Sequence, residues 1–262
     1  MQSHTSPRAR AAKEAVGRLP GRAVGARVPG STEFILQQHD PRLRGCPAPR
    51  PGSLLEDRVC AALTWNVFQT LALIAPSFWL RRLKARLVGL DAIDQAPLEA
   101  AALFWEPLGT RPAAAGGHPS RADVLIETEH AVFGLMALFG RDLSWDASAE
   151  PAADPVLQLI DGVSFRAGVR GCYVGLVASD AQAPVAASLF DRYAGSRDGL
   201  ARRLPARRDG LANICGIGRT TWTNMHTILR DCAGADVLDD LERYAASRTV
   251  RWLAAAGIAP AE

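Results

Sequence analysis

Apolar residues recur at helical spacing from residue 53 onward, after a first stretch with little apolar periodicity. The series that includes Leu63, Val67 and Leu71 has steps of three to five residues, which predicts a helix that Pro76 ends. A second, shorter helix is predicted over 78–90, with its charged residues on an outer, solvated face.

The middle of the chain has the pattern of β-strands. A short strand is expected at 103–105, and a hairpin is formed by the runs 122–127 and 131–139. The second run is apolar on both faces, which is typical of a central strand covered from two sides. An amphipathic helix over 151–167 and an apolar strand over 172–178 follow, and they predict a right-handed crossover between parallel strands.

Beyond residue 180 the pattern favours helices joined by arginine-rich connections. We therefore expect an α/β fold, with a mixed β-sheet flanked by helices. Its expected parts are a flexible basic leader rich in Pro, Gly and Arg (1–52), an α/β core (53–180) and a helical C-terminal extension (181–262).

The charge of the 262-residue chain is concentrated in that leader, which holds nine basic and three acidic side chains. The rest of the chain is mildly acidic, so the net charge of +3 does not by itself make the folded part a nucleic-acid binder. The leader has three interpretations: a flexible extension, an organellar transit peptide, or a basic arm that touches phosphate.

Candidate chemistry is sparse. The five cysteines show no CxxC spacing, which favours a reducing cytoplasm over a disulfide framework or a zinc site. No GxSxG elbow or phosphate-binding loop is present, and no apolar run reaches the length of a membrane span. Only two lysines, Lys13 and Lys84, occur among 30 basic residues, so a mechanism that needs a lysine has few candidates.

The order of elements, together with several local words, resembles the PD-(D/E)xK, or restriction-endonuclease-like, superfamily. "EDRVCAALTWNVFQTL" is similar to the first helix of bacterial members, and "FWEPL" to their first strand. "ADVLIET" is similar to the strand that carries the motif aspartate, and "DPVLQLIDG" to the next helix. The resemblance covers residues 56–180 and implies the restriction-endonuclease-like sheet.

In active members an aspartate and the glutamate of an E-x-K triplet hold Mg²⁺, and the lysine orients the attacking water. The resemblance places Asp123 at the aspartate position, after Ala122 in place of the usual proline. It places Met136 at the glutamate position and Leu138 at the lysine position. It therefore implies a degenerate catalytic centre, with Asp123 as a weak metal ligand.

A rearranged carboxylate site is the alternative. Asp123 and Glu127 share one face of an extended strand, and Glu56 on the first helix could join them to hold Mg²⁺. Gln158 matches a cleft-facing polar position of the family and could contact phosphate or water. The competing interpretation is that these are solvated surface residues.

Residues 211–221 have the shape of a helix-hairpin-helix turn, in which Gly216 and Gly218 let backbone N–H groups approach a DNA phosphate. Arg207, Arg208 and Arg219 surround the turn. The same glycines can also serve a structural role.

Three functions follow as hypotheses. The first is a nuclease-like protein with an inactive centre that binds a nucleic acid or a protein partner, and that needs no cofactor. The second is a Mg²⁺-dependent DNA endonuclease with the rearranged site. The third is a structural or interaction protein without a nucleic-acid role.

Overall fold

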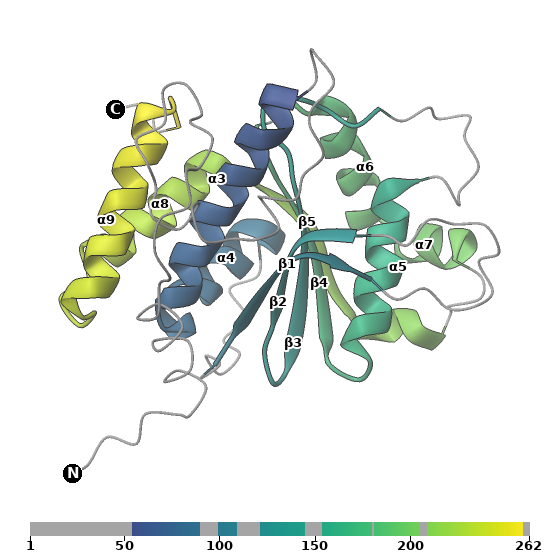
Figure 1. Ribbon diagram of the computed structural model, residues 1–262. Coiled ribbons are helices and arrows are strands. Elements are labelled where there is room, and N and C mark those ends of the chain that lie inside the picture. The colour runs from purple at the N-terminus through teal and green to yellow at the C-terminus, as the bar shows by residue number, and fades with distance from the viewer. Residues whose placement is uncertain are drawn as a thin grey trace, which may run out of the picture. The chain divides into compact units, whose positions relative to one another are not determined.

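The sheet at the centre of the fold has five strands in the order β1-β2-β3-β4-β5 (Figure 1). The pairs β1–β2 and β2–β3 are antiparallel, whereas β3, β4 and β5 run parallel to one another. Their bounds are β1 (Ala101–Pro107), β2 (Arg121–Glu127), β3 (Ala131–Ala137), β4 (Gly171–Ala178) and β5 (Ile214–Thr221). This computed structural model describes residues 54–89, 99–108, 121–144, 154–179, 181–204 and 209–258.

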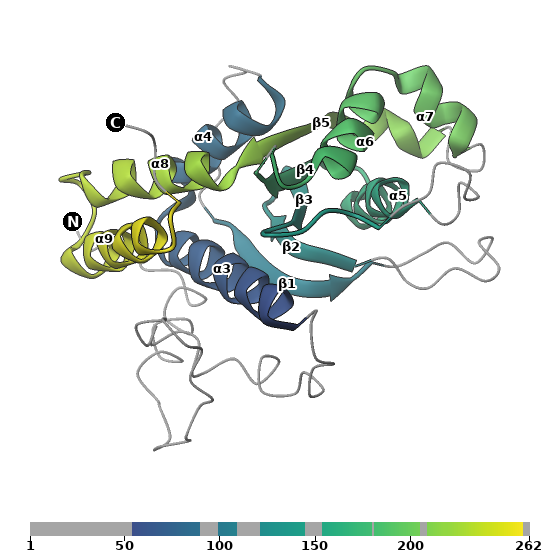
Figure 2. The same ribbon diagram turned by 90° about the horizontal axis from the view of Figure 1, so that it is seen from above.

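Helices cover both faces of the sheet, so the fold has three layers (Figures 1 and 2). One outer layer holds α3 (Leu54–Leu73), α4 (Pro76–Val88), α8 (Trp222–Ala233) and α9 (Asp240–Ala255). The other holds α5 (Pro155–Ala167), α6 (Pro184–Ala194) and α7 (Arg197–Arg203), and a short 3₁₀ helix, η4 (Asp209–Asn213), leads into β5. The predicted fold class, a mixed sheet flanked by helices with a mostly helical C-terminal part, is confirmed.

The sheet separates two hydrophobic cores, as the apolar pattern of β3 requires. Phe133 and Leu135 belong to the core under α3, α4, α8 and α9. Val132 and Leu138 belong to the core under α5 and α6. A strand that buries side chains on both faces has to be central, because successive side chains point to opposite sides.

Asp154 begins α5 and also fixes the neighbouring helix. Its carboxylate accepts hydrogen bonds from the backbone N–H groups of Val156 and Leu157, and Pro155 occupies the first helical position. The buried carboxylate also accepts a hydrogen bond from the Tyr193 hydroxyl on α6. The crossover helix and α6 are therefore tied together through one side chain.

The C-terminal part is not entirely helical, and here the sequence interpretation is wrong. The residues predicted to form a helix-hairpin-helix turn form η4 and β5, so Gly216 and Gly218 lie in a strand beside β4. Both glycines face the end of α4. A Cβ atom at Gly218 would lie 1.9 Å from the Leu87 carbonyl oxygen, and one at Gly216 would lie 2.6 Å from Cγ1 of Val88.

Lys84 is the second correction. The helix pattern placed it on a solvated face, but its side chain is only 7% exposed. Its Nζ lies 4.9 Å from the centre of the Tyr173 ring, which stacks on Phe133 at 4.7 Å.

None of the helices among the described residues is long and apolar enough to cross a membrane.

Candidate functional site

Asp123 lies at the start of β2, beside the end of β3. Its Oδ2 accepts a hydrogen bond of 2.7 Å from the backbone N–H of Ala137. Ala137 stands between Met136 and Leu138, the two positions that the resemblance assigns to glutamate and lysine. Leu138 is 4% exposed and packs in the core under α5, and Met136 packs against the same core. The aspartate and the two substituted positions therefore do lie together.

The environment of Asp123 shifts its proton equilibrium. Burial raises the pKa of this carboxyl from 3.8 to about 6, although the N–H of Ala137 and the charges of Arg141 and Arg121 act in the opposite direction. The carboxyl can therefore gain or lose a proton near neutral pH.

Cys60, from α3, approaches the same segment of β3. Its thiol donates a hydrogen bond of 3.3 Å to the Ala137 carbonyl oxygen. Burial, and then the charge of Asp123, raise the pKa of this thiol to about 11, so it stays protonated at neutral pH. A protonated, buried thiol is a poor nucleophile and a poor metal ligand, which makes Cys60 a structural neighbour of Asp123.

Trp105, on β1, stands opposite Asp123 in the sheet. Its neighbours pair regularly, Phe104 with Val124 and Glu106 with Ala122, but Trp105 itself has φ 50°. A bulky residue with positive φ is strained, and such strain concentrates at functional sites. The indole stacks on Trp65 of α3, with ring centres 6.2 Å apart and planes at 13°.

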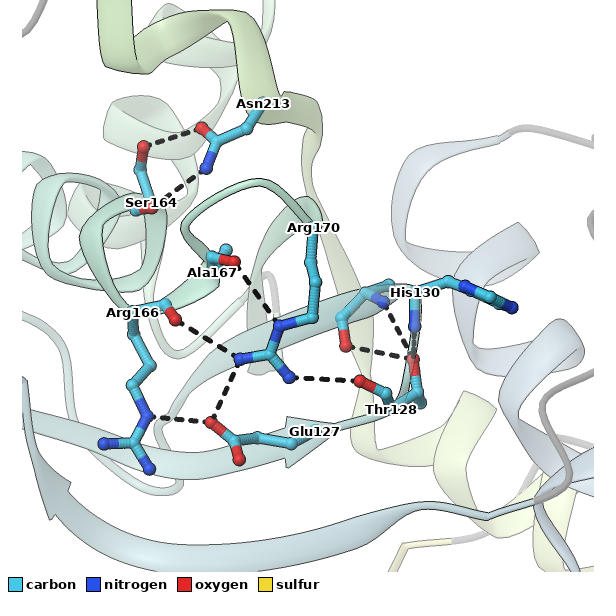
Figure 3. A network of polar contacts seen from close by, with 9 residues as sticks. Glu127, Thr128, His130, Ser164, Arg166, Ala167, Arg170 and Asn213 are labelled. Atoms are coloured by element: carbon cyan, nitrogen blue, oxygen red, sulfur yellow. Dashed lines mark hydrogen bonds and ion pairs between the residues drawn. The ribbon is translucent and has the colours of Figure 1, made fainter.

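Glu127 lies at the far end of β2 and takes part in a different network (Figure 3). Its Oε1 accepts a hydrogen bond of 2.8 Å from Arg166 Nε and lies 3.6 Å from an Arg170 nitrogen. Arg170 also donates to the carbonyl oxygen of Thr128, which ties α5 and the start of β4 to the β2–β3 turn. This network holds the hairpin against the crossover helix.

The structure does not bring Asp123 and Glu127 together. Four residues of extended strand separate their Cα atoms by about 13 Å, and the Glu127 carboxylate accepts a hydrogen bond from Arg166. The part of the chain that the structure describes contains no group of three His, Cys, Asp or Glu side chains that could hold a metal ion. Glu56 belongs to α3, but its side chain lies outside what the structure describes.

The other predicted site residues are dispersed. Gln158 lies on α5, partly buried. Arg219, on β5, donates a hydrogen bond of 2.9 Å to Asp191 of α6, which engages its guanidinium within the fold. Arg207 and Arg208, like the leader, fall outside the described residues.

Sequence reasoning missed Cys60 and Trp105 as neighbours of Asp123. Cys60 has no spacing that marks it, and the positive φ of Trp105 leaves no sequence signal because Gly, Asn and Asp are the residues normally expected there. No family model, curated protein or solved structure matches this chain. The PD-(D/E)xK resemblance therefore stays a prediction.

Proposed function

We propose that this chain is a nuclease-like protein with a degenerate catalytic centre, and that it works in the cytoplasm by binding a nucleic acid without cleaving it. One observation carries the proposal. Asp123 lies against the segment 136–138 at the end of β3, where the resemblance expects a glutamate and a lysine, and that segment offers only a thioether and aliphatic side chains.

The arrangement of elements supports the nuclease-like part. Apart from α4, which stands between α3 and β1, the order α3, β1, β2, β3, α5, β4, with β3 and β4 parallel and α5 as the crossover, is the order that the resemblance implies. Asp123 is the third residue of β2, the strand that the resemblance compares with the one carrying the motif aspartate.

The chemistry supports the degenerate part. Mg²⁺ is usually held by one or two carboxylates plus substrate phosphates, and it loses its water ligands reluctantly. One oxygen of Asp123 is engaged by a backbone N–H, and its pKa of about 6 weakens its hold on a cation as the pH falls. Lys84 does not replace the missing lysine, because it packs over the ring of Tyr173. Tyr173 pairs with Phe133, which is four residues, or about 13 Å, from Ala137 along β3.

The cleavage test compares the wild-type chain with Asp123→Ala on supercoiled and linear DNA, in Mg²⁺ and in Mn²⁺. Glu129→Ala is the matched control, because Glu129 is an exposed acid at the β2–β3 turn. We expect all three proteins to leave the DNA uncleaved to the same extent as a control without protein. Cleavage that Asp123→Ala abolishes and Glu129→Ala leaves unchanged would contradict the proposal and favour the endonuclease.

The binding test measures fluorescence anisotropy of labelled single- and double-stranded DNA and RNA over a salt series. We expect affinity that falls as salt rises, because phosphate contacts release counterions. A lack of binding to every probe at low salt would leave the interaction protein without a nucleic-acid role as the better description.

A further inference from the structure

The outer face of α9 carries an apolar stripe. Leu241 and Tyr244, three residues apart on the helix, are 58% and 54% exposed, and Val237, in the turn before it, is 78% exposed. The opposite face of α9 is buried through Ala246, Thr249 and Leu253. Large apolar side chains that stay exposed in a row mark interaction surfaces more often than scattered ones do.

Most charges on α9 are segregated along its axis. Asp239, Asp240 and Glu242 lie in the cap and first turn, where Arg243 forms an ion pair with Asp240, whereas Arg248 and Arg251 lie in the second half of the helix. Arg248 also donates a hydrogen bond of 3.3 Å to the Tyr244 hydroxyl, so basic and apolar groups share the stripe. An acidic start and a basic end are complementary to the same helix running in the opposite direction.

We propose that α9 is a self-association surface that pairs antiparallel with α9 of a second copy of this chain. A twofold axis at Tyr244 brings the two tyrosine rings together and sets each Leu241 within about one turn of the other ring. Asp240 precedes Tyr244 by four residues and Arg248 follows it by four, so they lie at the same level in the pair. Arg251 lies about 4.5 Å further along the axis.

The surface is small, which sets the expected strength. Stable interfaces bury about 800 Å² on each partner, and a single pair of helices of this length offers less. The pair is therefore a concentration-dependent dimer with an affinity in the micromolar range. Since the inner face of α9 is already packed on its own chain, the fold does not depend on the dimer.

Analytical ultracentrifugation of the full chain over a concentration series tests the pairing. We expect a monomer–dimer equilibrium, and Leu241→Asp raises its Kd about tenfold or more. Val169→Asp is the matched control, since Val169 is 103% exposed at the end of α5, far along the chain from α9, and it leaves the equilibrium unchanged. Circular dichroism confirms that both variants are folded.

Charge exchange tests the antiparallel direction. Asp240→Arg alone weakens the dimer, and so does Arg248→Asp alone, whereas the double variant, which exchanges the two charges that lie at the same level, restores most of the affinity. A chain that stays monomeric up to about 1 mM, or a dimer that Leu241→Asp does not weaken, overturns the proposal. If the double variant loses as much dimer affinity as the two single variants together, the antiparallel arrangement is overturned.

Discussion

Gly218→Ala tests the close packing of α4 on β5. A Cβ atom there would lie 1.9 Å from the carbonyl oxygen of Leu87 and 2.8 Å from its carbonyl carbon. Ordinary contacts are about 3.5 Å, so α4 or β5 has to move by about 1.5 Å. Both neighbouring atoms belong to the backbone and cannot rotate away, and Leu87 itself is anchored in the core.

Overpacking a core costs about 1–3 kcal/mol, and a collision with backbone belongs at the upper end of that range. We expect Gly218→Ala to lower the free energy of unfolding by about 3 kcal/mol or more, out of about 5–15 kcal/mol for a typical domain. In an unobstructed position the same change stabilises by about 0.4–1 kcal/mol, so the sign of the effect is informative.

Urea unfolding followed by circular dichroism measures the loss. Gly195→Ala is the matched control, because Gly195 has φ −79° and the nearest atom to its added Cβ is 3.5 Å away. We expect this control to be neutral or slightly stabilising. If Gly218→Ala loses less than about 1 kcal/mol, the close contact does not explain the glycine.

Three further predictions concern buried polar groups. The folded pKa of Asp123, about 6, lies above its usual 3.8, so its favourable contribution to the free energy of unfolding is complete below about pH 4 and lost as the pH rises through about 6. The stability difference between wild type and Asp123→Asn, from urea unfolding at several pH values, should therefore fall over that window, and a difference that does not change with pH would refute the shift. Asp154→Ala should lower the free energy of unfolding by about 2–4 kcal/mol, since it uncaps α5 and removes the acceptor of the Tyr193 hydroxyl, to which Arg203 still donates. Thermal melting beside Glu129→Ala checks this, and similar melting temperatures would show that the cap is dispensable. Neither side-chain atom of the buried Asn66 has a hydrogen-bond partner among the described residues, so Asn66→Leu should stabilise by about 1 kcal/mol in denaturant unfolding; a loss of that size would mean that the amide is bound.

The stretch from α3 to β4 could be predicted from sequence because its signals are local. Alternating or continuous apolar runs mark β2, β3 and β4, and the amphipathic pattern marks α5, although the prediction began this helix at residue 151 and it begins at Pro155. The resemblance grouped Asp123 with Met136 and Leu138, and the short hairpin that joins β2 and β3 makes these positions neighbours in the structure.

The prediction failed where distant segments decide the structure. The run from Ile214 to Thr221 has two glycines and little alternation, so it lacks the usual strand signal, yet β4 supplies the hydrogen-bond partners that make it β5. Lys84 is buried because an aromatic ring from β4 meets α4 there.

The sequence by itself determined the identity and order of the central elements and the presence of Met136 and Leu138 where the resemblance expects a glutamate and a lysine, because periodicity and residue identity are local properties. Only the tertiary structure decided that the C-terminal glycines make room for α4, that Glu127 is bound to arginines instead of joining Asp123, and that the Cys60 thiol reaches Ala137, the residue whose N–H binds that aspartate. These features depend on contacts between segments far apart in the chain, for which no single stretch of sequence carries a signal.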